Sequence, residues 1–128
     1  MIAITDTHTL IWHDAHPHRA SPALVRCLTD PAWTVLVSVV NPWEMTIKAQ
    51  TGKLILRADV PTNIADVLRV NPVRLLPVTL DHVFALGGLP PVHKDPFDRL
   101  LAAQAIAENA VLLTDDVIFR QYPVHTDW

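Results

Sequence analysis

Short aliphatic and β-branched runs alternate along this chain with longer segments that have helical signals, and this alternation constrains the fold most strongly. Ile2–Asp6, Thr34–Val40 and Val111–Thr114 have the composition of short, buried strands. Because helical segments separate them, the pattern predicts an α/β domain with a mainly parallel central sheet. A chain of 128 residues without repeats or linkers fits one domain over residues 1–128.

Capping residues predict where the helices begin. Ser21 followed by Pro22 predicts one start, Asp95 followed by Pro96 predicts another, and Thr79 can cap a helix between them. Asn41 is expected to cap a third helix, with Glu44 completing a capping box. The expected helices are 8–13, 21–30, 41–50, a segment from about 61 to 71, 79–87, 97–109 and 117–120. Short strands are expected at 75–78 and from 124 onward.

Composition narrows the class of protein. Cys27 is the only cysteine, which excludes an intrachain disulfide and makes a reducing cytoplasm the expected location. The first apolar run has no basic segment before it and ends at Asp6, so we expect no signal peptide. No stretch approaches the ~20 continuous apolar residues of a membrane span. With a formal net charge of −3, the chain lacks the basic balance typical of nucleic-acid-binding proteins; if its substrate is a nucleic acid, binding should be modest and assisted by metal.

Acidic residues fall at the points where ligands bind in parallel sheets. Asp6 ends the first predicted strand, Asp115 and Asp116 follow a later strand, and Glu44 and Asp98 lie in the first turns of helices. Each acid taken alone is more simply explained as a helix cap or a dipole partner. The carboxyl ends of parallel strands converge at one edge, however, so these acids can meet there.

Clustered carboxylates repel one another unless a cation neutralises them. Mg²⁺ and Mn²⁺ prefer oxygen ligands, and such a metal can activate water and hold phosphate oxygens during phosphodiester hydrolysis. The sequence is therefore compatible with a site for a divalent cation, Mg²⁺ or Mn²⁺, at this edge.

Four motifs together resemble a known family. They are Ile4-Thr5-Asp6-Thr7-His8, Pro42-Trp43-Glu44 with Lys48 and Gly52-Lys53-Leu54, His93-Lys94-Asp95-Pro96-Phe97-Asp98-Arg99, and Leu113-Thr114-Asp115-Asp116. The succession covers nearly the whole chain and resembles the PIN-domain family. Within it, the VapC-like toxins of bacterial type II toxin–antitoxin pairs are the most similar group. The segment HKDPFDRLLAAQA carries the resemblance most specifically.

The resemblance implies a Mg²⁺-dependent endoribonuclease on a PIN-like, Rossmann-like α/β/α sandwich. Its metal-site acids correspond here to Asp6, Glu44, Asp98 and Asp116. Thr114 is then a supporting hydroxyl, Asp115 a less favoured neighbour of Asp116, and Asp95 a helix cap behind the ligands. The implied partners are RNA, a homodimer mate, and an antitoxin that covers the acidic cleft with an arginine or lysine.

Further side chains near these acids each have two interpretations. Lys48 follows Glu44 by four residues, so it forms either an ordinary intrahelical ion pair or a contact that orients Glu44 or binds RNA phosphate. Arg99 is a candidate phosphate contact, while His8 and His93 are expected to cap or pack. The tryptophans, including Trp43, are expected in the core or an interface rather than as base-stacking platforms.

Three other functions compete with the nuclease. A structural zinc site is disfavoured, because His13 and His16 have no second closely spaced pair and only one cysteine accompanies them. A phosphatase with an aspartyl nucleophile at Asp6 is disfavoured, because His8 stands where a second acid is usual. The main alternative is a catalytically silent PIN-fold module that binds RNA or protein.

Overall fold

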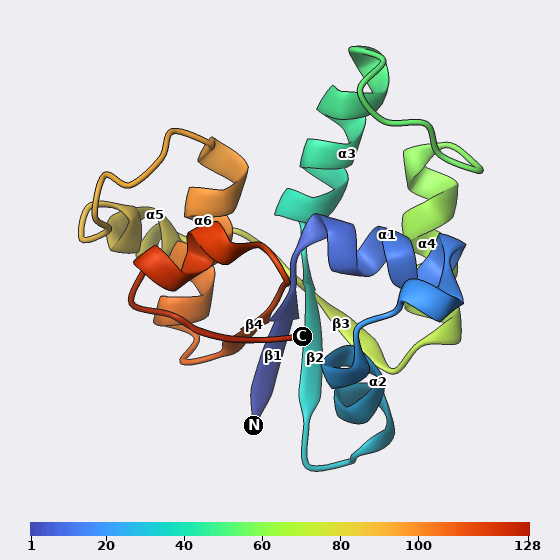
Figure 1. The fold of residues 1–128 in the computed structure, drawn as a ribbon, viewed down its shortest axis with the longest axis horizontal. Coiled ribbons are helices and arrows are strands. Elements are labelled where there is room, and N and C mark those ends of the chain that lie inside the picture. The colour runs from blue at the N-terminus through green and yellow to red at the C-terminus, as the bar shows by residue number, and fades with distance from the viewer.

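Along the described backbone, which covers residues 1–128, five short strands form one sheet (Figure 1). The computed structural model describes the side chains of all residues except Asp14 and Pro17. The strands are β1 (Ile2–Thr5), β2 (Thr34–Ser38), β3 (Val73–Leu76), β4 (Val111–Leu113) and β5 (His125–Asp127). Their order is β3-β2-β1-β4-β5, and all four neighbouring pairs are parallel. The predicted α/β fold with a parallel sheet is confirmed.

Helices connect the strands and cover both faces of the sheet. They are α1 (Thr7–Ala15), α2 (Pro22–Thr29), α3 (Val40–Gln50), α4 (Val60–Val70), α5 (Leu80–Leu86) and α6 (Pro96–Ala107), with 3₁₀ turns η1 (Pro17–Arg19) and η2 (Val117–Gln121). In Figure 1, α5 and α6 lie on one side of the sheet, and α1, α2 and α4 lie on the other. Within the described chain, no helix has the length and apolar character needed to cross a membrane.

Alternation along the central strands explains the two apolar layers. Ile4 and Leu112 point into the larger core, which contains Leu101 of α6. Their neighbours Ala3 and Leu113 point to the opposite face and pack with Leu24 and other side chains of α2. Because both faces of β1 and β4 are covered, these strands are apolar at almost every position, as buried parallel strands require.

Local capping accounts for most helix starts. The side chains of Ser21 and Thr79 accept backbone N–H bonds at the starts of α2 and α5, and Asp95 does the same for α6, so the predicted caps are confirmed. The predicted helix and strand segments all occur, with some boundaries displaced. The segment expected at 75–78 begins at Val73 and ends at Leu76, because Pro77 has no N–H to continue the ladder.

The predicted capping box at Asn41 is wrong. The helix α3 begins one residue earlier, and Val39 occupies the N-cap position without a side-chain hydrogen bond. The hydroxyl of Ser38 accepts the N–H of Val40 at 3.0 Å, so β2 ends at Ser38. Asn41 lies inside the helix, fully buried, and its amide Nδ2 donates to the Thr5 carbonyl at 3.3 Å. A long-range contact to β1 therefore outweighs the local capping signal.

Candidate active site

The direction of the strand order changes at β1, and the acidic residues lie at this edge of the sheet. From β1 the chain adds β2 and β3 on one side, and later adds β4 and β5 on the other. The crevice beyond the carboxyl ends of strands at such a switch point is where open α/β sheets bind ligands. Asp6 follows β1 directly and Thr114 follows β4 directly. The backbone N–H of Asp6 donates to the Leu113 carbonyl at 3.2 Å.

Hydrogen bonds on both carboxylate oxygens hold Asp6 at this edge of the sheet. Its Oδ1 accepts the Thr9 N–H at 2.7 Å and thereby caps α1, while the Thr114 hydroxyl donates to its Oδ2. The residue is 4% exposed. Burial raises the pKa of Asp6 above its ordinary value, although the hydrogen bonds from Thr114 and Thr9 act in the opposite direction. A buried carboxylate of this kind favours a nearby cation.

Asp116 is connected to Asp6 through Thr114. The hydroxyl of Thr114 donates to Asp6 and accepts the backbone N–H of Asp116 at 3.1 Å. The carboxylate of Asp116 also caps η2 through the Ile118 N–H at 3.1 Å. Both Asp115 and Asp116 are exposed, and both line a polar groove with Thr114. This places the predicted supporting hydroxyl between two predicted acids; a metal role for Asp116, or for Asp115, stays a prediction.

Glu44 reaches the same edge from α3. It is 3% exposed, and its Oε1 accepts the Thr7 hydroxyl at 2.5 Å. Lys48, one helical turn later, donates from Nζ to Oε2 of Glu44 at 2.5 Å. The Nδ2 of Asn41 donates to the Thr7 hydroxyl at 3.1 Å. Glu44 is therefore fixed by α1 on one oxygen and by its own helix on the other.

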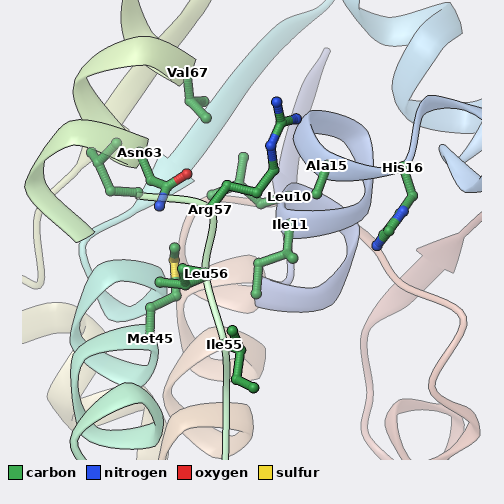
Figure 2. A pocket seen from close by; sticks show the side chains of 11 residues that line it. Leu10, Ile11, Ala15, His16, Met45, Ile55, Leu56, Arg57, Asn63 and Val67 are labelled. Carbon is green, nitrogen blue, oxygen red and sulfur yellow. The ribbon is translucent and has the colours of Figure 1, made fainter. Parts of the chain in front are cut away.

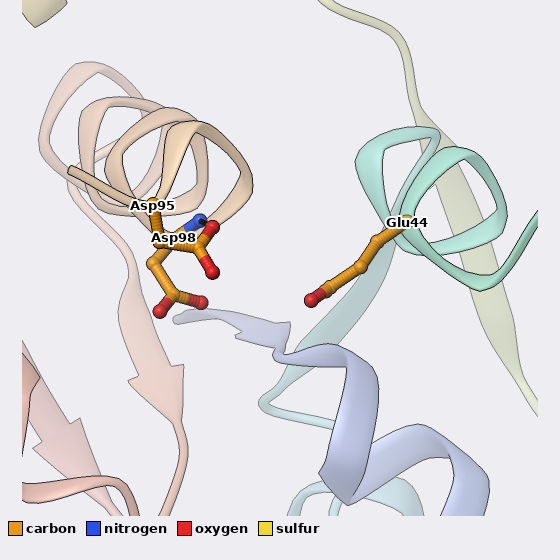
Figure 3. Close-up of side chains that lie close together, drawn as sticks. All are labelled: Glu44, Asp95 and Asp98. Atoms are coloured by element: carbon orange, nitrogen blue, oxygen red, sulfur yellow. Dashed lines mark hydrogen bonds between the residues drawn. The ribbon is translucent and has the colours of Figure 1, made fainter. Parts of the chain in front are cut away.

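Three carboxylates meet across the gap between α3 and α6. Among the residues whose side chains are described, Glu44, Asp95 and Asp98 form the one group in which each offers an oxygen within 4.8 Å of the others. Figure 3 shows Glu44 pointing from α3 toward Asp95 and Asp98 at the start of α6. Asp6 and Asp116 lie outside this group. The structure thus brings together two of the four predicted metal-site acids, along with Asp95.

Asp95 combines two features. Its Oδ1 accepts the N–H groups of Phe97 and Asp98 at 2.9 and 3.1 Å, which confirms the predicted helix cap. The same carboxylate belongs to the group with Glu44 and Asp98. The sequence pattern Asp-Pro explains the cap but gives no sign that Asp95 also faces Glu44.

The carboxyl group of Asp98 has a strongly raised pKa. Burial and the neighbouring Asp95 carboxylate raise the pKa of Asp98 from 3.8 to about 6, and Glu44 adds to this effect, while a hydrogen bond from His93 opposes it. Burial alone would lower the pKa of Lys48, but the hydrogen bond and charge of Glu44 outweigh it, so that pKa is raised. One ammonium group thus faces several carboxylates, and the negative charge is incompletely balanced by the protein.

The donor set fits a hard divalent cation. Carboxylate oxygens from two helices converge within 4.8 Å, and their repulsion adds to the burial that raises the pKa of Asp98. Mg²⁺ and Mn²⁺ bind such oxygen ligands and relieve this repulsion. Histidine and cysteine are not members of this group, so among the described residues it does not have the composition of a structural zinc site.

Sequence reasoning missed the supporting polar residues around the acids. Thr7 and Asn41 join α1 to α3, and Tyr122 contacts His93, which in turn contacts Asp98. Thr7 directly follows Asp6 in the first motif, but only the folded arrangement shows that its hydroxyl serves Glu44. The guanidinium of Arg99 donates to the Pro90 carbonyl at 2.9 Å in this structure, and its predicted phosphate contact stays a prediction.

Aromatic and apolar side chains border the acidic edge. Trp43, half exposed, packs edge-on against Phe97 with ring centroids 4.7 Å apart, and so links α3 to α6 beside the carboxylates.

On the other side of α3, an apolar cavity of about 130 Å³ lies among α1, α3, α4 and the segment before α4 (Figure 2). Its apolar lining includes Leu10, Ile11, Met45, Leu56, Ile64 and Val67.

A comparison with family models identifies the family of this chain. The PIN domain model matches residues 3–124, almost the full length of the chain. The chain belongs to the PIN domain family. The resemblance seen in the four motifs is thereby confirmed, and the acids of this PIN domain lie at the sheet edge described above.

Solved structures show the same fold. A chain in the structure of VapBC2 from Rickettsia felis, bound to a DNA fragment from its promoter, matches with a TM-score of 0.73 and 19% identity, covering 99% of this chain and 98% of that one. VapBC-1 from nontypeable Haemophilus influenzae gives 0.65 and 20%, covering 94% and 92%. FitAcB from Neisseria gonorrhoeae gives 0.63 and 18%, covering 100% and 97%. A comparison with curated proteins gives no match.

Proposed function

We propose that this PIN domain is a divalent-metal-dependent endoribonuclease and the toxin of a toxin–antitoxin pair. The observation that carries the proposal is the convergence of Glu44, Asp95 and Asp98 within 4.8 Å, at the same edge as the buried Asp6. The family membership and the resemblance to VapC-like toxins support an RNA substrate. The proposed ion is Mg²⁺, with Mn²⁺ as a substitute.

Glu44 and Asp98 would hold the metal, together with Asp6 and Asp116. When bound, the ion would supply a more acidic water and a positive charge beside the phosphate oxygens. The protein's own residues prepare the site. Thr7 and Lys48 hold the two oxygens of Glu44 in place, and the Thr114 hydroxyl fixes Asp6.

Purified protein incubated with structured and single-stranded RNA tests the nuclease proposal. Cleavage is expected with Mg²⁺ or Mn²⁺, and it should stop with EDTA or in the Asp98→Asn and Asp6→Asn variants. Asp30→Asn is the matched control, because Asp30 is exposed in the turn after α2, on the way to β2. It should cleave as well as the wild type. Cleavage that persists in both site variants would identify a contaminating nuclease and refute the proposal.

The silent-module alternative makes a different prediction for the same samples. RNA would be retained in a filter-binding assay, but no new ends would appear with either metal across diverse RNAs. That result would replace the nuclease proposal by the binding-module alternative. If the protein does cleave RNA, mapping of new RNA ends in cells after brief expression would define its substrate.

The toxin role requires a protein partner. The carboxylates at the edge, whose charge Lys48 balances only in part, form a site that a basic side chain of an antitoxin would occupy in competition with metal. The VapBC structures similar in fold support such an assembly. We propose a cytoplasmic homodimer as the form that binds the antitoxin.

Co-purification with the product of an adjacent short reading frame tests this role. The complex should form in size-exclusion chromatography, light scattering should give a toxin dimer, and added antitoxin should suppress RNA cleavage. Active nuclease without any neighbouring inhibitor gene would contradict the toxin role and leave the nuclease proposal standing.

A further inference from the structure

A chain of hydrogen bonds runs from a half-buried arginine to the acidic group. Arg99 donates from Nη1 to the Tyr122 hydroxyl at 3.2 Å. That hydroxyl contacts Nδ1 of His93, and Nε2 of His93 lies 3.2 Å from Oδ2 of Asp98. These residues come from the segment before α6, from α6 itself and from the end of η2. Three separate parts of the fold therefore converge on one carboxylate.

The chemistry of the donors determines where the hydrogens lie. A guanidinium can only donate, so the oxygen of Tyr122 accepts from Arg99. The single phenolic hydrogen is then available for Nδ1 of His93, which must be unprotonated to accept it. The imidazole hydrogen accordingly lies on Nε2 and points to Asp98. The opposite neutral tautomer would place the Nε2 lone pair against a carboxylate oxygen, where neither atom can donate.

We propose that His93 is a positioning residue of the acidic site, held by Tyr122 as its Nε2–H tautomer so that it donates to Asp98. The proposal rests on the proposed function insofar as Asp98 is a metal ligand. A histidine behind a ligating carboxylate orients it toward the metal, and loss of such a partner typically costs about 10–100-fold in metal affinity. The hydrogen bond from His93 also counteracts the burial and repulsion that raise the pKa of Asp98.

The geometry separates this role from simple packing. Tyr122 is the only tyrosine, is 4% exposed, and packs its ring 5.4 Å from the His93 ring. Tyr122→Phe therefore keeps the ring contact and removes only the hydroxyl. Arg99 also donates to the Pro90 carbonyl at 2.9 Å, which ties the segment carrying His93 to α6. The network thus fixes both the position and the tautomer of the imidazole.

Imidazole nitrogen NMR of the metal-free protein at pH 7.5 tests the tautomer directly. His93 should appear as the Nε2–H form in the wild type and as a mixture in Tyr122→Phe. His82 is an internal reference, since its Nδ1 accepts the Thr79 N–H at 3.0 Å and its signals should not change. A hydrogen on Nδ1 of His93 in the wild type, or an unchanged His93 spectrum in Tyr122→Phe, would overturn the proposal.

Calorimetric titration with Mn²⁺ tests the consequence for the metal. His93→Gln keeps an N–H donor near the position of Nε2, whereas His93→Ala removes it. We expect affinity to fall about 10–100-fold in His93→Ala and to be largely retained in His93→Gln. Circular dichroism is used to check that both variants are folded. Equal losses in two folded variants would overturn the donor role. If the wild type has the expected tautomer but binds no Mn²⁺, the proposed function is refuted, and with it the role of His93 in positioning a metal ligand.

Discussion

Replacing Asp98 by asparagine should stabilise the metal-free protein, although it removes a residue of the proposed active site. The raised pKa of about 6, against 3.8 ordinarily, means that the folded protein binds this proton more tightly than the unfolded chain does. The unfolding free energy therefore falls as pH rises from about 4 to about 6 and stays lower above that range. The amide of the Asp98→Asn variant carries no charge at any of these pH values, so the variant escapes this loss.

The size of the effect follows from the same shift. A difference of about two pKa units corresponds to about 3 kcal/mol. Because the side chain is 20% exposed and solvent screens the neighbouring charges, we expect about 1–2 kcal/mol at pH 7.5. For a chain of this length, that raises the melting temperature by about 3–10 °C.

Differential scanning calorimetry in EDTA measures this at pH 7.5 and at pH 4, where the advantage of the variant should largely disappear. Added Mg²⁺ should then reverse the order: at 100 times its Kd it stabilises the wild type by about 2.7 kcal/mol, and the variant much less. Asp30→Asn should melt like the wild type in every condition. An Asp98→Asn protein that is less stable than the wild type in EDTA at pH 7.5 would refute the expectation that the buried, repelled charge of Asp98 destabilises the metal-free fold.

Three further substitutions each remove one polar group that holds the site or the core. Thr114→Val removes the hydroxyl that donates to the buried carboxylate of Asp6, and should lower the unfolding free energy by about 1–3 kcal/mol in urea titrations. Lys48→Met should lower the unfolding free energy by about 1–2 kcal/mol, because it leaves the buried Glu44 carboxylate without its ion-pair partner. Adding Glu44→Gln in a double-mutant cycle should recover part of this loss. Additive losses would argue against a coupled ion pair. Ser38→Ala removes the hydroxyl that donates to the buried side-chain amide of Gln104 at 2.5 Å, and should lower the unfolding free energy by about 1–3 kcal/mol in calorimetry. An unchanged melting temperature would contradict this.

The sequence predicted the fold because its signals are local. Alternating buried strands and capped helices follow from nearest neighbours, as the confirmed caps at Ser21, Thr79 and Asp95 show. Asn41 was predicted wrongly for a physical reason. The side-chain amide of Asn41 donates to the carbonyl of Thr5, a residue distant in sequence, and Asn41 does not cap its own helix. A local pattern contains no information about such a partner.

The candidate site was only partly predictable. The acids could be expected at one edge, since parallel strands bring their carboxyl ends together. Which oxygens come within 4.8 Å depends on how α3 and α6 pack against each other at this edge, and this made Asp95 a member of the group. The supporting contacts of Thr7 and Tyr122 depend on the same packing, so no spacing along the chain indicates them.

Anomalous diffraction from crystals soaked in Mn²⁺ tests the central claim most directly, because it locates the metal without reference to activity. We expect an anomalous peak between the carboxylates of Glu44 and Asp98, on the side of Asp6, and its loss in Asp98→Asn crystals soaked in the same way. Crystals of folded wild type without a peak at this edge, at Mn²⁺ concentrations that support RNA cleavage, would contradict it.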